Sequence, residues 1–189
     1  MKKILAGSIL LLLLACSNKK KEKEGFFPVL SYIKSQVAQV DTSLYPIIMI
    51  TWQDSVHTDT TYVKREEFRD LAIDFLDIPD LTEKKYQSLY TEEKFFDQGL
   101  NRVVFTCKPK KTDTAMIQQQ ETQIAPDPSG DKVKSFFIDL IVPNKDSSVE
   151  KKMLWKVDES FQVATIVQKP GQPEITRIIK VAWNERPDE

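Results

Sequence analysis

Histidine and cysteine are almost absent from this chain, and their scarcity removes whole classes of chemistry. The 189 residues contain one histidine, His57, and two cysteines, Cys16 and Cys107. Zinc sites draw on several such residues, and catalytic dyads and triads pair a nucleophile with histidine. The sequence also lacks a D-x-D-x-D calcium loop and a G-x-S-x-G motif. We therefore expect no metal site, no cofactor and no catalytic residues.

Glycine is also scarce, and neither sign of charge is in excess. The five glycines build neither G-x-G-x-x-G nor G-x-x-x-x-G-K, the loops that hold phosphates. Lysine and arginine together number 27 and aspartate and glutamate 28, which gives a formal net charge of −1. Because the two signs are interspersed, no basic surface is expected, and nucleic acid is not an expected partner.

The chain does have an apolar leader. Two lysines precede an apolar run that ends in Leu13-Leu14-Ala15-Cys16. The run is shorter than the ~20 apolar residues of a membrane-spanning helix. A positive head followed by a short apolar core is typical of a signal peptide. An ordinary secretory signal with an incidental cysteine would share these features.

This leader resembles the signal peptide of a bacterial lipoprotein, whose lipobox ends in the acylated cysteine. The resemblance implies that residues 1–15 are removed and that Cys16 carries a covalent lipid, so the membrane is a partner through this anchor. Several acyl chains hold a protein firmly, whereas one chain binds only marginally. Ser17 stands where aspartate would retain a lipoprotein in the inner membrane. This implies the outer membrane, with the domain on the periplasmic side and cell-surface display as the alternative.

The remaining chain divides into three unequal parts. Residues 16–25 are mostly charged or polar, which predicts a flexible tether. Residues 26–184 are long enough for a single globular domain with its own core. Residues 185–189 are polar and are expected to fray. If Cys16 is acylated, Cys107 stands alone, so no intramolecular disulfide is expected.

Two stretches show the period of an amphipathic helix. In residues 26–40, valine and isoleucine recur on one face, and Gln36 is expected on the polar side. Residues 65–76 repeat the pattern from Phe68 onward and predict one continuous second helix. Helices of this kind bury their apolar face against another element, most often a sheet.

Alternation of apolar and polar residues predicts strands in most of the rest. The predicted strands are residues 47–52, 60–63, 86–96, 102–108, 114–124, 133–142, 149–157, 161–168 and 174–183. Residues 81–89 are ambiguous, because Thr82-Glu83-Lys84-Lys85 could also cap a short helix. Gly99, Gly130 and Gly171 each fall in a predicted turn that needs left-handed backbone. The last four strands have connections too short for a parallel crossover. We therefore predict an α+β fold with both helices packed on a large curved antiparallel sheet, a meander, with a half-open barrel as the alternative.

Cys107 and His57 form the only possible thiol–imidazole pair. Val103, Phe105 and Cys107 alternate on one face of the predicted 102–108 strand, as core residues do. We therefore expect a structural cysteine. His57 falls in a polar turn and is expected to be exposed.

The aromatic residues admit two interpretations. Trp52, Trp155 and Trp183 are candidates for an apolar binding surface, and a packed core is the competing interpretation. A filled core would favour a binding or scaffolding module that is not an enzyme. A large apolar cavity would favour a carrier or chaperone for a lipophilic ligand, such as a lipid, an acyl chain or a lipoprotein. We expect the scaffolding module, bound to an envelope protein, and we rank an envelope hydrolase third.

Overall fold

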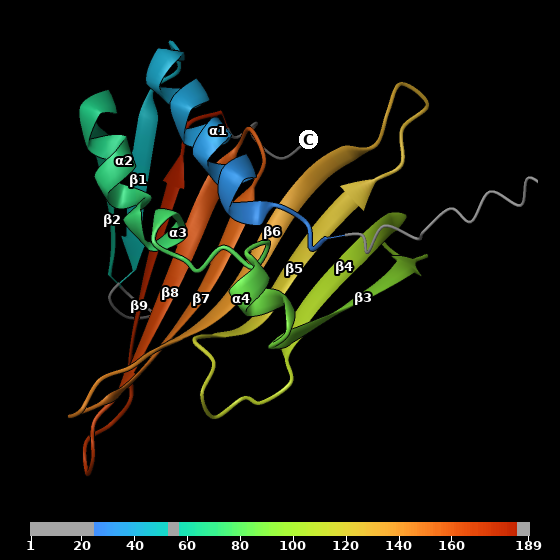
Figure 1. Cartoon of the computed structure of the whole chain (residues 1–189). Helices are drawn as coiled ribbons and strands as arrows, with labels where there is room; N and C mark the ends of the chain where they lie inside the picture. Colours follow the sequence, from blue (N-terminus) through green and yellow to red (C-terminus); the bar gives the residue numbers. More distant parts are fainter. Residues whose placement is uncertain (1–24, 53–56, 185–189) are drawn as a thin grey trace, which may run out of the picture.

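Nine antiparallel strands form one open sheet on which the rest of the chain is built (Figure 1). The computed structural model describes residues 25–52 and 57–184. The strand order is β2-β1-β9-β8-β7-β6-β5-β4-β3. The strands are β1 (Ile47–Trp52), β2 (Thr58–Val63), β3 (Tyr90–Asp97), β4 (Arg102–Pro109), β5 (Ile117–Ala125), β6 (Lys132–Val142), β7 (Ser148–Lys156), β8 (Ser160–Gln168) and β9 (Ile175–Ala182).

The antiparallel meander is confirmed, and the sheet does not close into a barrel. Strands β3 to β9 follow one another in space in their chain order, and the β1–β2 hairpin joins the far side of β9. The two edge strands, β2 and β3, lie at opposite ends of this order, so the sheet does not close. Strand β1 lies between β2 and β9, which explains why its sequence is apolar on both faces.

The helices all cover one face of the sheet, and the first of them is close to its predicted position. The helical segments are α1 (Val29–Thr42), a short 3₁₀ segment (Arg65–Glu67), α2 (Phe68–Leu71), α3 (Ile73–Leu76) and α4 (Lys84–Gln87). Figure 1 shows α1, α2 and α3 over the end of the sheet that contains β1, β2, β9 and β8. Strands β3 and β4 extend beyond these helices.

The predicted second helix over residues 65–76 is confirmed in position, but it is divided into three short pieces. Its first turn is a 3₁₀ segment, and Ala72, at φ −85° and ψ 3°, interrupts the α-helical ladder between α2 and α3. The amide of Phe75 then donates to the carbonyl of Ala72 at 3.0 Å, a three-residue step. The period still identified the buried face correctly, since Phe68, Ala72 and Phe75 are all fully buried.

The predicted strand over residues 86–96 begins four residues too early. Residues 84–87 form the single turn α4, in which the amides of Tyr86 and Gln87 both donate to the carbonyl of Glu83. Strand β3 starts at Tyr90. The run Thr82-Glu83-Lys84-Lys85 is compatible with a helix, and the chain forms a helical turn there. The alternation that begins at Tyr86 forms a strand only from Tyr90 onward, where β4 provides a pairing partner.

Five aromatic rings fill the space between the helices and the sheet. Phe68 and Phe75 from the helical segments meet Trp155, Phe161 and Trp183 from the sheet. Trp155 stacks on Phe161 with 5.3 Å between ring centroids, and Phe75 meets Trp155 edge-on at 5.1 Å. Both geometries are favoured by the ring quadrupoles. We call these five residues the aromatic cluster, and all five are buried.

A buried polar contact connects α1 to the β7–β8 turn. Gln36, expected to face water, is buried, and its amide nitrogen donates to Asp158 Oδ1 at 2.9 Å. Its amide oxygen accepts the Asp158 N–H at 2.8 Å. These bonds hold Asp158 in the left-handed region, at φ 61°.

Two of the three glycines predicted to adopt left-handed backbone, Gly130 and Gly171, have positive φ. In the β3–β4 turn, Asn101 has the positive φ in place of Gly99.

Candidate functional site

Two of the three candidate tryptophans belong to the core. Trp155 is 0% exposed and Trp183 is 5% exposed, both within the aromatic cluster, so they form no binding surface. The packed-core interpretation is therefore correct for this pair. Trp52 lies apart, half-buried at the end of β1, where it is registered with Ile178 on the face without helices.

Cys107 is a buried thiol in a position that suppresses its reactivity. It is free, and its Sγ donates to Glu92 Oε1 at 3.3 Å. Burial, and secondarily the negative charge of Glu92, raise the pKa of the thiol far above its ordinary value. Because the thiolate is the nucleophile, this environment is the opposite of a catalytic one. His57 precedes β2, and six strands separate β2 from β4, so the two residues form no dyad.

The predicted anchor cannot be examined in the fold itself. Residues 1–15, Cys16, Ser17 and all of the tether except Gly25 lie outside the described residues, as does the predicted tail of residues 185–189. Within the described ranges, no helix has the length and apolar character needed to cross a membrane.

An apolar depression lies where β3 begins. A pocket of about 260 Å³ opens between the segment before β3 and the loop that joins β4 to β5. Its lining residues are Pro79, Tyr86, Leu89, Tyr90, Lys111, Thr114, Ala115 and Met116. Most of these side chains are apolar. We call this depression the β3 pocket.

Hydrogen bonds fix both walls of the β3 pocket. On one side, the Lys110 amide donates to the carbonyl of Leu89 at 2.9 Å. On the other side, the Gln118 side chain donates to the carbonyl of Ala115 at 2.6 Å, and the Ile141 amide donates to that of Met116 at 2.8 Å. The floor residue Tyr90 donates its hydroxyl to the Ile117 carbonyl at 3.2 Å. These hydrogen bonds hold the backbone on both sides of the pocket in place.

The rim of the β3 pocket exposes apolar side chains to solvent. Leu89 is 54% exposed and Met116 is 40% exposed. Methionine adapts its shape to different partners because its side chain is unbranched and polarisable. Lys111 adds a positive charge beside these residues. The rim thus suits an apolar group that has a negative charge next to it.

Charged side chains also interact at two places outside the β3 pocket, on β6 and β7 and in the β5–β6 turn. Asp139 on β6 lies on the sheet face without helices, where burial and then Glu150 raise its pKa, and Glu150 itself pairs with Lys152 at 3.2 Å. The described ranges contain no group of three or more histidine, cysteine, aspartate or glutamate residues arranged to hold a metal ion.

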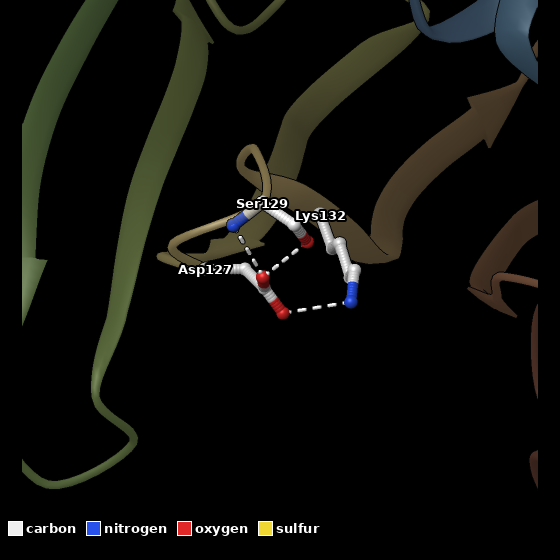
Figure 2. A network of polar contacts seen from close by, with 3 residues as sticks. All are labelled: Asp127, Ser129 and Lys132. Atoms are coloured by element: carbon white, nitrogen blue, oxygen red, sulfur yellow. Dashed lines mark hydrogen bonds and ion pairs between the residues drawn. The ribbon is translucent and has the colours of Figure 1, made fainter.

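The charged contacts of the β5–β6 turn centre on one carboxylate, Asp127. Figure 2 shows Asp127 accepting hydrogen bonds from the amide and hydroxyl of Ser129, at 2.9 and 2.5 Å, and pairing with Lys132 at 2.7 Å. These contacts hold the pKa of Asp127 well below its ordinary value, with the Lys132 contact as the largest cause. Because the bonds are local to the β5–β6 turn, they serve the fold of that turn.

Sequence reasoning did not find the β3 pocket. Its lining comes from three short segments between residues 79 and 116, and none of them has a recognisable motif. The apolar residues Leu89 and Met116 were the only signal in the sequence, and each alone is an ordinary surface residue.

No family model, no curated protein and no solved structure matches the chain.

Proposed function

We propose that this protein is a lipid-anchored protein of the cell envelope whose domain is a non-enzymatic binding and scaffolding module. The lipobox residues Leu13-Leu14-Ala15-Cys16 support the anchor, and Ser17 supports the outer membrane, with the domain facing the periplasm. The observation that carries the choice of a scaffold is the aromatic cluster, which fills the space beneath the helices where a carrier would hold its ligand.

The β3 pocket is the place where this module would hold its partner. Its volume of about 260 Å³ lies just below the ~300–1,000 Å³ typical of pockets that enclose a drug-sized ligand. A pocket of this size suits one or two apolar side chains of an envelope protein. Lys111 on the rim favours a partner segment in which an acidic residue adjoins the apolar one.

A carrier for a lipophilic ligand is the second candidate, and the apolar lining of the β3 pocket favours it. The volume restricts such a ligand to a short acyl segment, because a whole lipid needs a much larger enclosure. In this version the partner at the rim would be a lipid or a lipoprotein that delivers the chain. The two candidates therefore share one site and differ in what enters it.

A photo-crosslinker placed at Met116 in the native host tests the site. Ile73 on α3 is the matched control, because it is 47% exposed against 40% for Met116 and does not line the pocket. We expect an adduct of one discrete protein mass from position 116 and none from position 73. Adding Leu89→Lys, which places a charge on the rim, should abolish the adduct while leaving the unfolding midpoint unchanged.

The outcomes separate the candidates. A lipid adduct at position 116 without a protein adduct would replace the scaffold by the carrier. Equal labelling at positions 116 and 73, or none at either, would remove the β3 pocket from the proposal.

The anchor has its own measurement: the mass of the mature N-terminus should show an acylated Cys16, and Cys16→Ser should release the protein from the membrane. An unmodified Cys16 would contradict the anchor.

A further inference from the structure

The start of the described chain is fixed against the far end of the sheet. The Phe27 amide donates to Glu92 Oε1 on β3 at 3.3 Å. The Phe27 ring lies 6.3 Å from the ring of Phe105 on β4 and 5.9 Å from that of Phe136 on β6. Figure 1 shows the chain leaving α1 toward the β4 side of the sheet. Any segment that precedes Gly25 therefore departs from the β3–β4 side of the domain.

This position limits how the domain sits above a bilayer. The limit rests on the proposed function, in which Cys16 carries the lipid. Gly25 is nine residue steps from Cys16, and at ~3.6 Å per step these span at most roughly 32 Å. The β3–β4 side therefore lies within about that distance of the headgroups. The edge strand β2 lies at the opposite end of the sheet.

The β3–β4 hairpin exposes three large apolar side chains close to this departure point. Phe95 is 51% exposed, Phe96 is 50% exposed and Leu100 is 53% exposed. The turn that holds Leu100 is ordered, since the Leu100 amide donates to Asp97 Oδ1 at 3.0 Å and Asn101 adopts φ 51°. Exposed aromatic and leucine side chains gathered at one tip indicate a surface that meets an apolar medium.

The arrangement of these side chains favours lipid over protein as that medium. Phe95 and Phe96 are successive residues of an edge strand and therefore point to opposite faces of the sheet. Leu100 lies in the turn between them and β4. Side chains that diverge in this way line no groove and present no single face to a shaped partner. They do suit the interfacial layer of a bilayer, which accepts apolar side chains from any direction.

We propose that the tip of the β3–β4 hairpin, with Phe95, Phe96 and Leu100, inserts into the interface of the membrane that holds the acyl chains of Cys16. The tip is a second membrane contact that orients the domain. The β3 pocket lies at the other end of β3, and Tyr90 to Asp97 spans seven residue steps of ~3.3 Å, roughly 23 Å. Insertion of the tip therefore points the pocket away from the bilayer, toward a partner.

An environment-sensitive fluorophore on the acylated protein tests the contact. The mature protein is purified from its own membranes and reconstituted into vesicles of phosphatidylethanolamine and phosphatidylglycerol, with NBD attached at Leu100→Cys. Tyr62→Cys on β2 and Leu44→Cys are controls, because both parent residues are large, apolar and exposed but lie at the other end of the sheet. The buried Cys107 should not compete for label.

We expect position 100 to show blue-shifted, brighter emission on vesicles and to be quenched by a lipid-borne quencher, while positions 62 and 44 stay as in water. Phe95→Ser combined with Phe96→Ser should reverse the shift at position 100. If NBD at position 100 keeps its emission in water while Cys16 is acylated, the inference is overturned and the proposed function stays intact. A shift produced only by envelope proteins, and not by vesicles, would overturn it in favour of a protein partner. Absence of acylation, read from the N-terminal mass, would instead overturn the anchor.

Discussion

Strands β7 and β8 and strands β3 and β4 belong to one sheet, yet they differ in what covers them. On β7 and β8, Met153, Trp155 and Phe161 are almost completely buried beneath the helices. On β4, Val104, Thr106 and Cys107 are still buried, whereas on the edge strand β3 only Tyr90 is buried. We infer that the stability of this fold is concentrated in the half of the sheet beneath the helices, and that the other half, which ends in β3, is available to bind.

The boundary between the two halves follows from where the helices end. Segments α1 to α3 lie over the β1, β9 and β8 end of the sheet, and past β6 the main cover on that face comes from Phe27, α4 and the residues before it. Strand β4 marks the limit, because Val104, Thr106 and Cys107 are still buried on it. Both the β3 pocket and the hairpin tip lie in the sparsely covered half.

Truncating one aromatic side chain in each half of the sheet should give the largest difference in the free energy of unfolding. Trp155→Ala removes a fully buried ring from the aromatic cluster and should lower the free energy of unfolding by about 3–5 kcal/mol. Phe96→Ala removes a ring that is half exposed on an edge strand and should change it by less than about 1 kcal/mol. Urea unfolding of the two variants measures both values.

Trp155→Phe is the control for the larger effect. It keeps a ring in the cluster and removes the indole Nε1, which is buried and has no hydrogen-bond partner among the described residues. An unpartnered buried donor costs about 1–3 kcal/mol, so its removal should offset part of the lost packing. If Trp155→Ala and Phe96→Ala cost the same, the concentration of stability in one half is wrong.

The dependence of the free energy of unfolding on alkaline pH should show whether the core extends to Cys107 on β4. Burial and then Glu92 raise the pKa of Cys107, so the folded chain keeps a proton that the unfolded chain releases near pH ~8.5. Above that pH the unfolded state binds fewer protons, and stability should fall by up to ~1.4 kcal/mol per pH unit. Below it, this thiol should contribute no pH dependence.

Urea midpoints over a series of pH values, with Cys107→Ala as the control, measure this contribution. The variant should lose the decline that starts near pH ~8.5. A decline that remains should begin nearer pH ~10, where Tyr32 and Tyr90, whose pKa values are raised chiefly by burial, start to titrate in the unfolded state. An unchanged decline in Cys107→Ala would place the thiol outside the core and move the boundary between the halves toward β5.

Periodicity predicted the sheet well because its strands are half-buried, so each one alternates in sequence as it does in space. Every predicted strand corresponds to an observed one, and the short connections correctly placed the last four strands, β6 to β9, side by side. The strand over residues 86–96 started too early, and the helix over residues 65–76 broke into pieces. In both places contacts between distant residues act beyond local propensity: β3 pairs with β4 from Tyr90 onward, and Phe68, Ala72 and Phe75 pack into the core.

The candidate site was less predictable because its parts are distant in sequence or ordinary in type. Gln36 reads as a surface residue, and its partner Asp158 lies 122 residues away. The sequence left both a core and a surface position open for Trp155 and Trp183, and the structure buries both. The rim residues Leu89 and Met116 gain meaning only when the β4–β5 loop meets the start of β3.

Native-state hydrogen exchange tests most directly the central claim, that the half beneath the helices holds the fold and leaves the β3–β4 half free for binding. Amides of the β7–β8 ladder should exchange only through global unfolding, at the free energy measured in urea. Amides of the β3–β4 ladder should exchange through a smaller opening, at a free energy at least ~2 kcal/mol lower. Equal free energies in the two ladders would show that the sheet opens as one unit and would contradict the claim.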